Sequence, residues 1–297
     1  MESRPVPALI LVAVLVVGGL AAGFIASQVE FERPTPKVSE PQLLDTDAIP
    51  GWATAPLPDF TQYSVVSEKK DAFFGYLFPR IALANLRIQA ARDYLEQLSN
   101  KPELSEEERK WLTTRATRLR VDGETTEDLV SGLERRMHII PPSLVLAQAA
   151  NESAWGTSRF ATQGNNLFGQ WCFNPGCGLV PNSRPAGMTH EVEVFKSPYR
   201  SIRAYLTNLN RHNAYQNLRE RRLALLNENR FPDGINLAGG LQSYSERGQA
   251  YVEEIRSMIR VNNLSDYDQR QQALSAAENP LEKLDALISD YRERFSN

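Results

Sequence analysis

The chain has 297 residues, of which 42% are hydrophobic and 23% are charged, and its formal net charge at pH 7 is −3. This length suits one domain of about two hundred residues with additional segments, which is large enough to bury a proper core. The slightly negative charge and the lack of a basic block argue against nucleic-acid binding, and an anionic polymer would have to be met by local positive groups.

Residues 8–26 form an uninterrupted apolar run that is just long enough to cross a bilayer. Arg4 precedes it and Glu30 follows it, which places the N-terminus inside and the rest of the chain outside. A cleaved signal peptide is the alternative, but its apolar region is usually shorter and no clean Ala-x-Ala site follows here. We therefore expect residues 1–30 to be a single-pass anchor in the inner membrane, with the following domain in the periplasm.

Residues 31–63 are rich in proline and show neither helical nor strand periodicity. Repeated prolines block regular hydrogen bonding and stiffen a chain toward polyproline II. We expect a periplasmic linker that holds a domain away from the membrane. A short ordered strand that packs on the domain around residues 60–66 is the alternative for its last part.

Three helices are expected next, of which the third begins at Thr125 or Thr126 and ends near His138. The first spans residues 67–98, where apolar side chains recur at three- and four-residue steps and Ser67 is a candidate cap. Pro79 lies inside this pattern and should kink or split the helix. The second begins near Ser105, where Glu108 completes a capping box.

Residues 142–156 indicate a buried helix. Pro142 suits a first helical position, the residues after it are mostly small or apolar, and Gly156 can close the last turn in a left-handed conformation. Glu152 then lies in the final turn, on the same face as Gln148.

This placement of Glu152 has chemical consequences. The C-terminal end of a helix carries partial negative charge, and apolar neighbours such as Ala149, Trp155 and Phe168 would desolvate the carboxyl; both effects raise its pKa. A carboxyl that stays protonated near neutral pH is what a general acid for glycoside cleavage requires. The alternative is a surface glutamate at a frayed helix end, although Glu is rarely buried without a reason.

Cys172 and Cys177 follow in a looped segment, with Pro175 and Gly176 between them. They could form a disulfide across a tight turn in an oxidising compartment. A metal pair is the alternative, but zinc would have to recruit His190 and a carboxylate, because the chain has no second cysteine pair. We expect the disulfide and neither a metal nor another cofactor.

Residues 188–195 alternate like a strand, with Glu191 and Glu193 on one face and Val192 on the other. Two carboxylates downstream of Glu152 could supply a general base or stabilise developing positive charge. A solvated hairpin face is the alternative for each of them. We choose Glu191 over Glu193 as the second catalytic group.

A helix is expected to follow Ser197, with Tyr215 on its apolar stripe and at its end, where polar groups could hydrogen-bond to sugar hydroxyls. A last amphipathic helix over residues 281–295 belongs to a C-terminal helical extension, residues 269–297. The sequence does not decide whether this helix packs on the domain, binds a partner or projects freely.

Several of these stretches carry a resemblance to a known family. They are SLVLAQAANESAWGTSRF (143–160), GNNLFGQW (164–171), HEVEVF (190–195), NLNRHNAY (208–215) and YSERGQAY (244–251). The chain closely resembles the bacterial glucosaminidase family of peptidoglycan hydrolases, and within it the branch of Bax-like proteins, from about Ser67 to Asp268.

The resemblance implies a mainly α (α+β) fold, in which a lysozyme-like helical domain with a small β-hairpin lobe spans residues 64–268. It also implies hydrolysis of the β-1,4 glycosidic bond after N-acetylglucosamine in peptidoglycan glycan strands. Glu152 would protonate the leaving oxygen, and either Glu191 would activate water or the acetamido group of the substrate would itself attack. A lytic transglycosylase and a non-catalytic peptidoglycan-binding protein are the alternatives, and the oligomeric state is undecided.

The same resemblance implies a set of side chains that would hold the glycan, with aromatic faces stacked on sugar rings. In the family a pair of tyrosines lines the glycan cleft; Tyr244 matches one of them, with a one-residue difference in its spacing to Tyr251. The substrate-binding residues expected are Asn166, Phe168, Trp171, Tyr215 and Tyr244.

Overall fold

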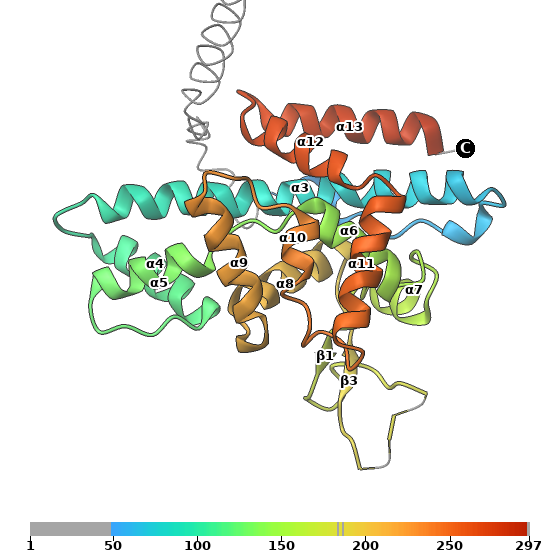
Figure 1. Ribbon diagram of the computed structural model, residues 1–297, viewed down its shortest axis with the longest axis horizontal. Coiled ribbons are helices and arrows are strands. Elements are labelled where there is room, and N and C mark those ends of the chain that lie inside the picture. Colours follow the sequence, from blue (N-terminus) through green and yellow to red (C-terminus); the bar gives the residue numbers. More distant parts are fainter. Residues whose placement is uncertain (1–48, 183, 186, 296–297) are drawn as a thin grey trace, which may run out of the picture. The chain divides into compact units, whose positions relative to one another are not determined.

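The computed structural model describes residues 49–182, 184–185 and 187–295, which belong to the second of two units, Pro36–Asn297. Figure 1 shows this part as a set of helices with a small sheet. The predicted anchor and most of the predicted linker lie outside the described residues. None of the helices within the described ranges is both long enough and apolar enough to span a bilayer.

The described part of the chain contains α-helices, short 3-10 helices and short strands. The helices are η1 (Gly51–Thr54), η2 (Phe60–Gln62), α3 (Val66–Ser99), α4 (Glu106–Leu119), α5 (Thr126–Arg136), α6 (Pro142–Glu152), α7 (Arg159–Gly164), α8 (Pro198–Arg211), η3 (Asn213–Tyr215), α9 (Gln216–Asn227), α10 (Gly234–Ala238), α11 (Gln249–Val261), α12 (Ser265–Ser275) and α13 (Pro280–Phe295). The strands are β1 (Trp171–Cys172), β2 (Gly178–Leu179) and β3 (Glu191–Glu193).

Helix α3 runs unbroken for 34 residues, with Pro79 inside it. The predicted helix is confirmed, but Pro79 does not split it, because nearly every residue from Ala72 to Leu86 is buried and this packing outweighs the loss of one backbone hydrogen bond. The predicted cap was wrong. The helix begins before Ser67, and its capping residue, Val65, makes no side-chain cap bond.

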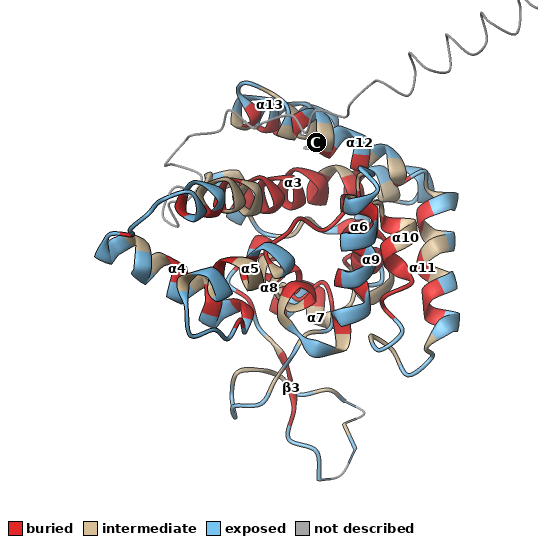
Figure 2. Ribbon diagram, turned by 60° about the vertical axis from the view of Figure 1, so that its left-hand side comes forward, coloured by how far each residue is buried: buried red, intermediate tan, exposed pale blue. Residues whose placement is uncertain are grey.

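Helix α6 is enclosed by α3, α10, α11 and α12, so residues 142–150 are all buried (Figure 2). Pro142 occupies the first turn as predicted. At this end the carboxylate of Asp268, on α12, accepts hydrogen bonds from the backbone N–H of Ser143 at 2.8 Å and its hydroxyl at 2.6 Å. The first turn of α6 is therefore held by a buried side chain that lies 125 residues later in the sequence.

A smaller apolar cluster joins the C-terminal half of α3 to α4 and α5. The predicted capping box of α4 is confirmed, since the Ser105 side chain accepts from the Glu108 N–H and the Glu108 side chain accepts from the Ser105 N–H. Helix α5 begins with the same motif, formed by Thr125 and Asp128. The start of each of these two helices is thus set by a capping box within its first turn.

The three strands form an antiparallel sheet in the order β1-β3-β2. In its register Trp171 lies opposite Val192, and Gly178 lies opposite Glu193. Strand β3 is shorter than the predicted strand over residues 188–195. The mainly helical α+β class with a small β lobe is confirmed for the described residues, and the arrangement fits a lysozyme-like domain.

The last part of the predicted linker, residues 49–63, belongs to the folded domain. Ala53 and Phe60 are fully buried in the main core, and the Tyr76 hydroxyl of α3 donates to the carbonyl of Ala55 at 2.7 Å. The prediction of a free spacer was wrong for these residues, because scattered apolar side chains between the prolines cover α3. Residues 60–62 form a 3-10 turn instead of the alternative strand.

Helix α13 packs along α3, which resolves the question that the sequence left open. Leu284 and Ile288 are buried in this contact. The indole N–H of Trp52 donates to the Asp285 carboxylate at 2.6 Å, so the C-terminal helix is also tied to the N-terminal stretch.

Candidate active site

Glu152 is the last residue of α6, and the chain leaves it through a left-handed turn. Ala154, Trp155 and Gly156 all have positive φ, at 50°, 60° and 77°. Gly156 is left-handed as predicted, although the turn begins two residues earlier. A Cβ at Gly156 would meet the Phe60 ring at 2.6 Å, so both backbone conformation and packing favour glycine there.

The carboxyl of Glu152 is the end of a chain of hydrogen bonds that crosses three helices. The Tyr251 hydroxyl, on α11, donates to Glu152 Oε1 at 2.7 Å, and Gln148 Nε2, on α6, donates to the Tyr251 oxygen at 2.9 Å. The Tyr205 hydroxyl, on α8, donates to Gln148 Oε1. These three partners are buried, whereas Glu152 is half-buried. The relay Tyr205–Gln148–Tyr251 therefore orients a carboxyl that still reaches solvent.

Burial raises the pKa of Glu152, as the sequence predicted. The hydrogen bonds from Tyr251 and Asn151 and the charge of Arg247 lower this pKa, but their effect is smaller than that of burial. Burial and the charge of Glu152 together raise the pKa of Tyr215 to about 12. Tyr215 thus lies within electrostatic range of the carboxyl.

An aromatic wall adjoins this carboxyl. The Tyr244 ring stacks on Tyr251 with a centroid distance of 5.3 Å and an interplanar angle of 8°, and Tyr215 lies 6.2 Å from Tyr244. The structure thus brings the predicted residues Tyr215 and Tyr244 together beside the partner of Glu152. Tyr244 and Tyr251 stack on each other despite the one-residue difference in their spacing.

Two predicted glycan contacts need correction. Phe168 is only 2% exposed, and its ring stacks on Tyr205 at 4.0 Å inside the core, so it has no face to offer a sugar. Asn166 is 1% exposed; its amide donates to the carbonyls of Gln170 and Glu193 and accepts from the N–H groups of Phe168 and Gln170. All four hydrogen-bonding positions of this amide are used. Asn166 and Phe168 therefore position the site and do not touch its opening.

Trp171, on β1, has the opposite placement. Its side chain is 55% exposed, and one face of the ring stacks on His190 at 3.9 Å and 17°. His190 fixes the indole plane, and the second face remains accessible. Trp171 is the predicted aromatic residue best placed to stack on a sugar ring.

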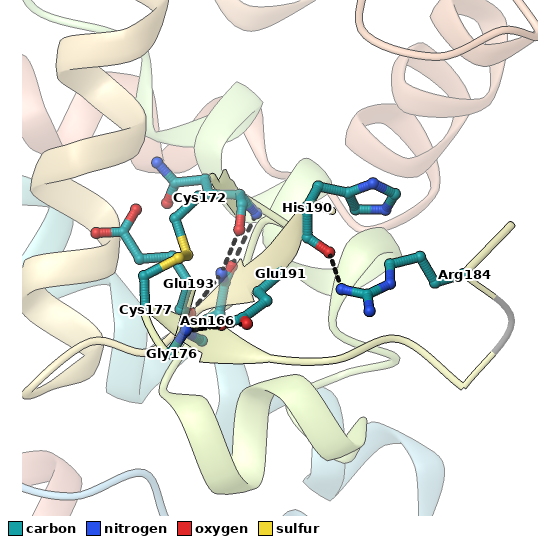
Figure 3. Close-up of a disulfide and its surroundings, with 10 residues drawn as sticks. Asn166, Cys172, Gly176, Cys177, Arg184, His190, Glu191 and Glu193 are labelled. Atoms are coloured by element: carbon teal, nitrogen blue, oxygen red, sulfur yellow. Dashed lines mark hydrogen bonds between the residues drawn. A yellow bond between two sulfur atoms is a disulfide. The ribbon is translucent and has the colours of Figure 1, made fainter. Parts of the chain in front are cut away.

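Glu191 is engaged by the backbone of the hairpin. Its two carboxylate oxygens accept from the N–H groups of Gly176 at 3.0 Å and Gly178 at 2.8 Å, and these bonds lower its pKa (Figure 3). The residue is 8% exposed. A carboxylate held in this way stabilises the loop and is poorly available as a base, which corrects the preference for Glu191 over Glu193.

Glu193 is half-buried, and burial raises its pKa. Its carboxyl makes no side-chain hydrogen bond or ion pair with any residue that the structure describes. Of the two strand carboxylates, Glu193 is therefore the one that no other described residue holds.

The predicted disulfide between Cys172 and Cys177 is present, with a Cα–Cα distance of 6.2 Å. The two sulfur atoms lie close to the Glu191 carboxylate, which would make a three-ligand group if the cysteines were thiolates. A disulfide supplies no thiolate, so this group does not form a metal site in the oxidised protein.

Sequence reasoning did not assign the relay. The spacing of four between Gln148 and Glu152 was a usable signal, because it places both on one helix face. Its other members, Tyr205 and Tyr251, come from helices further along the chain, 57 and 103 residues after Gln148. No local pattern reports a pairing of that kind.

Comparisons with known proteins identify a family and a relative that this chain resembles. The glucosaminidase family, described as mannosyl-glycoprotein endo-beta-N-acetylglucosaminidase, matches residues 129–264, which include Glu152, its hydrogen-bonded relay and the β lobe. The protein called Bax of Escherichia coli strain K12 is 34% identical over 208 residues, which cover 69% of this chain and 74% of that protein. No solved structure matches the chain significantly.

Proposed function

This chain belongs to the Bax-like glucosaminidase family, and on that premise we propose that it is a peptidoglycan hydrolase with Glu152 as its general acid. The bond cleaved is the β-1,4 glycosidic bond after N-acetylglucosamine. The observation that carries this proposal is a half-buried carboxyl with a raised pKa, oriented by the buried Tyr205–Gln148–Tyr251 relay and bordered by an aromatic wall.

In the proposed mechanism, the protonated Glu152 transfers its proton to the leaving oxygen as the anomeric carbon gains oxocarbenium character. The carboxyl becomes an anion in this step. The hydrogen bond from Tyr251 strengthens because a charged acceptor binds a donor more tightly, and it therefore stabilises the charge that develops on Glu152.

For the second step we propose Glu193 as the group that activates water or stabilises the positive charge. Its free, half-buried carboxyl supports this choice, and Glu191 keeps the turn around Gly176 in place. Attack by the acetamido group of the substrate is the competing route. It requires no protein base, so it predicts that loss of the Glu193 carboxyl leaves turnover largely intact.

We further propose that Trp171, Tyr215 and Tyr244 contact the glycan, and that the domain works on the periplasmic side of the inner membrane. The apolar run over residues 8–26 supports an anchor. The Cys172–Cys177 disulfide supports an oxidising compartment, because such bonds do not persist where glutathione and thioredoxin keep thiols reduced.

The deciding experiment is mass spectrometry of purified peptidoglycan after digestion with the chain from Pro36 onward, which retains the residues that pack on α3. The matched control is Glu152→Gln, whose amide oxygen can still accept from Tyr251. Fragments that end in reducing N-acetylglucosamine, made by the unaltered protein alone, are the expected result. Anhydro-muramyl ends would identify a lytic transglycosylase, and binding without cleavage by either protein would identify a binding module.

A further inference from the structure

A cavity of about 80 Å³ lies between α3, α4 and α8, on the side of α8 that faces away from Gln148. It is large enough for a group of several atoms, since a single water needs far less space. Four arginines line it, and its remaining walls are mostly apolar. The arginines are Arg87 on α3, Arg115 and Arg118 on α4, and Arg203 on α8.

Three of the four arginines have no carboxylate partner among the described residues. Arg115, Arg118 and Arg203 take part in none of the ion pairs formed among the described residues. Burial, together with repulsion from Arg118, Arg203 and Arg87, lowers the pKa of Arg115 to about 10. Placing like charges together in a partly buried site is unfavourable unless something compensates for it.

Two of the four guanidinium groups also lie over aromatic rings. Arg115 lies over the Trp111 ring at 5.4 Å, and Arg203 lies over the Tyr199 ring at 5.9 Å. Tyr199 is fully buried, yet its hydroxyl has no hydrogen-bond partner among the described residues. The charges of Arg203 and Arg87 act on this phenol, although Tyr199 itself does not line the cavity.

We propose that this arginine cavity binds a small multivalent oxyanion, one that carries phosphate or carboxylate groups. Guanidinium forks match the geometry of both groups, and an anion would relieve the repulsion among the arginines. The site is distinct from the candidate active site: the two share helix α8, with Arg203 in the cavity and Tyr205 in the relay.

The test uses the full-length chain in a non-ionic detergent and two probes, inorganic phosphate and citrate, with sodium chloride added to keep the ionic strength constant. Melting temperature and calorimetric titration are the readouts. We expect saturable binding and a melting temperature that rises with the logarithm of probe concentration, while chloride alone has no such effect. A response to phosphate only, or to citrate only, identifies the group that the cavity accepts.

The double variant Arg115→Gln/Arg118→Gln should bind at least about tenfold more weakly, since two charge-assisted contacts are lost. Arg109→Gln is the matched control, because Arg109 lies on the same helix, is exposed and pairs at 3.8 Å with Glu103. Should the double variant fail to fold, Arg203→Gln replaces it. The proposal is overturned if neither probe binds the unaltered protein, or if the variant and the control respond alike. Neither readout uses glycan cleavage, so the outcome is independent of the proposed function.

Discussion

Replacing Tyr251 with phenylalanine removes one hydroxyl and two hydrogen bonds, the one donated to Glu152 and the one accepted from Gln148. A hydrogen bond to a charged group contributes about 1.5–3 kcal/mol, and the lower end applies here because Glu152 is half-buried. Because this bond lowers the pKa of Glu152, its loss destabilises the anion and raises the pKa further. About 1.5 kcal/mol corresponds to roughly tenfold tighter proton binding.

The assay is the pH dependence of kcat/KM for glycan cleavage, from acidic to mildly alkaline pH. A general acid works in its protonated form, so activity falls as the pH rises through its pKa. In Tyr251→Phe the alkaline limb should move to higher pH, so that activity relative to the plateau rises about tenfold at a fixed pH on that limb. The plateau itself should fall, because the carboxyl is less firmly oriented.

The same substitution leaves the buried N–H of Gln148 without a partner, which should lower the free energy of unfolding by about 1–3 kcal/mol. Tyr76→Phe is a control for this loss of stability, because the Tyr76 hydroxyl donates to the carbonyls of Ala55 and Pro56 and does not contact Glu152. An alkaline limb that stays in place or moves to lower pH in Tyr251→Phe would refute the reasoning. So would an equal displacement in the control.

Three further predictions concern the β lobe and the core. Glu193→Gln should lower kcat at unchanged stability. Glu191→Gln should lower the melting temperature, because two backbone N–H groups lose a charged acceptor. The reverse pattern in kinetics and calorimetry would contradict our assignment. Asn166→Ala should cost at least about 2 kcal/mol in urea unfolding, since buried backbone groups lose their partners, while Asn174→Ala, exposed in the same lobe, should cost little. Burial raises the pKa of Asp268 to about 6, so the folded state binds this proton more tightly than the unfolded state does. The free energy of unfolding should therefore fall as the pH rises from about 4 to about 6. Asp268→Asn should flatten that dependence, and an unchanged slope in urea titrations would speak against it.

The parts of the fold that the sequence predicted are those fixed by neighbouring residues. The capping box of Ser105 and Glu108 and the first turn at Pro142 depend on side chains and backbone within one helical turn. The placement of Glu152 on the Gln148 face follows from a spacing of four. The raised pKa of Glu152 followed as well, because most residues of the helix that carries it are small or apolar and buried.

The predicted site residues that the structure buries or engages are those whose partners come from other elements. An Asn amide or a Glu carboxyl can bind a ligand or a neighbouring backbone equally well, and Asn166 and Glu191 both bind backbone. The sequence around Phe168 does not show whether its ring stacks on a sugar or, as the structure has it, on Tyr205. The stretch around Phe60 was read as linker because its apolar side chains are irregularly spaced between prolines, so no periodicity marks it as part of the core.

The bond between Trp52 and Asp285 joins residues that are 233 positions apart, and α13 covers α3 over a similar separation. Contacts between residues so far apart in the sequence form late and slow the folding of a domain. The reason is that the entropy lost in closing the long intervening loop must be overcome first. A chain that folds from its N-terminus as it emerges would thus expose the apolar surface of α3 until α13 had emerged. The domain would be complete only then, and the interval before it is when such a chain most needs protection from aggregation and proteolysis.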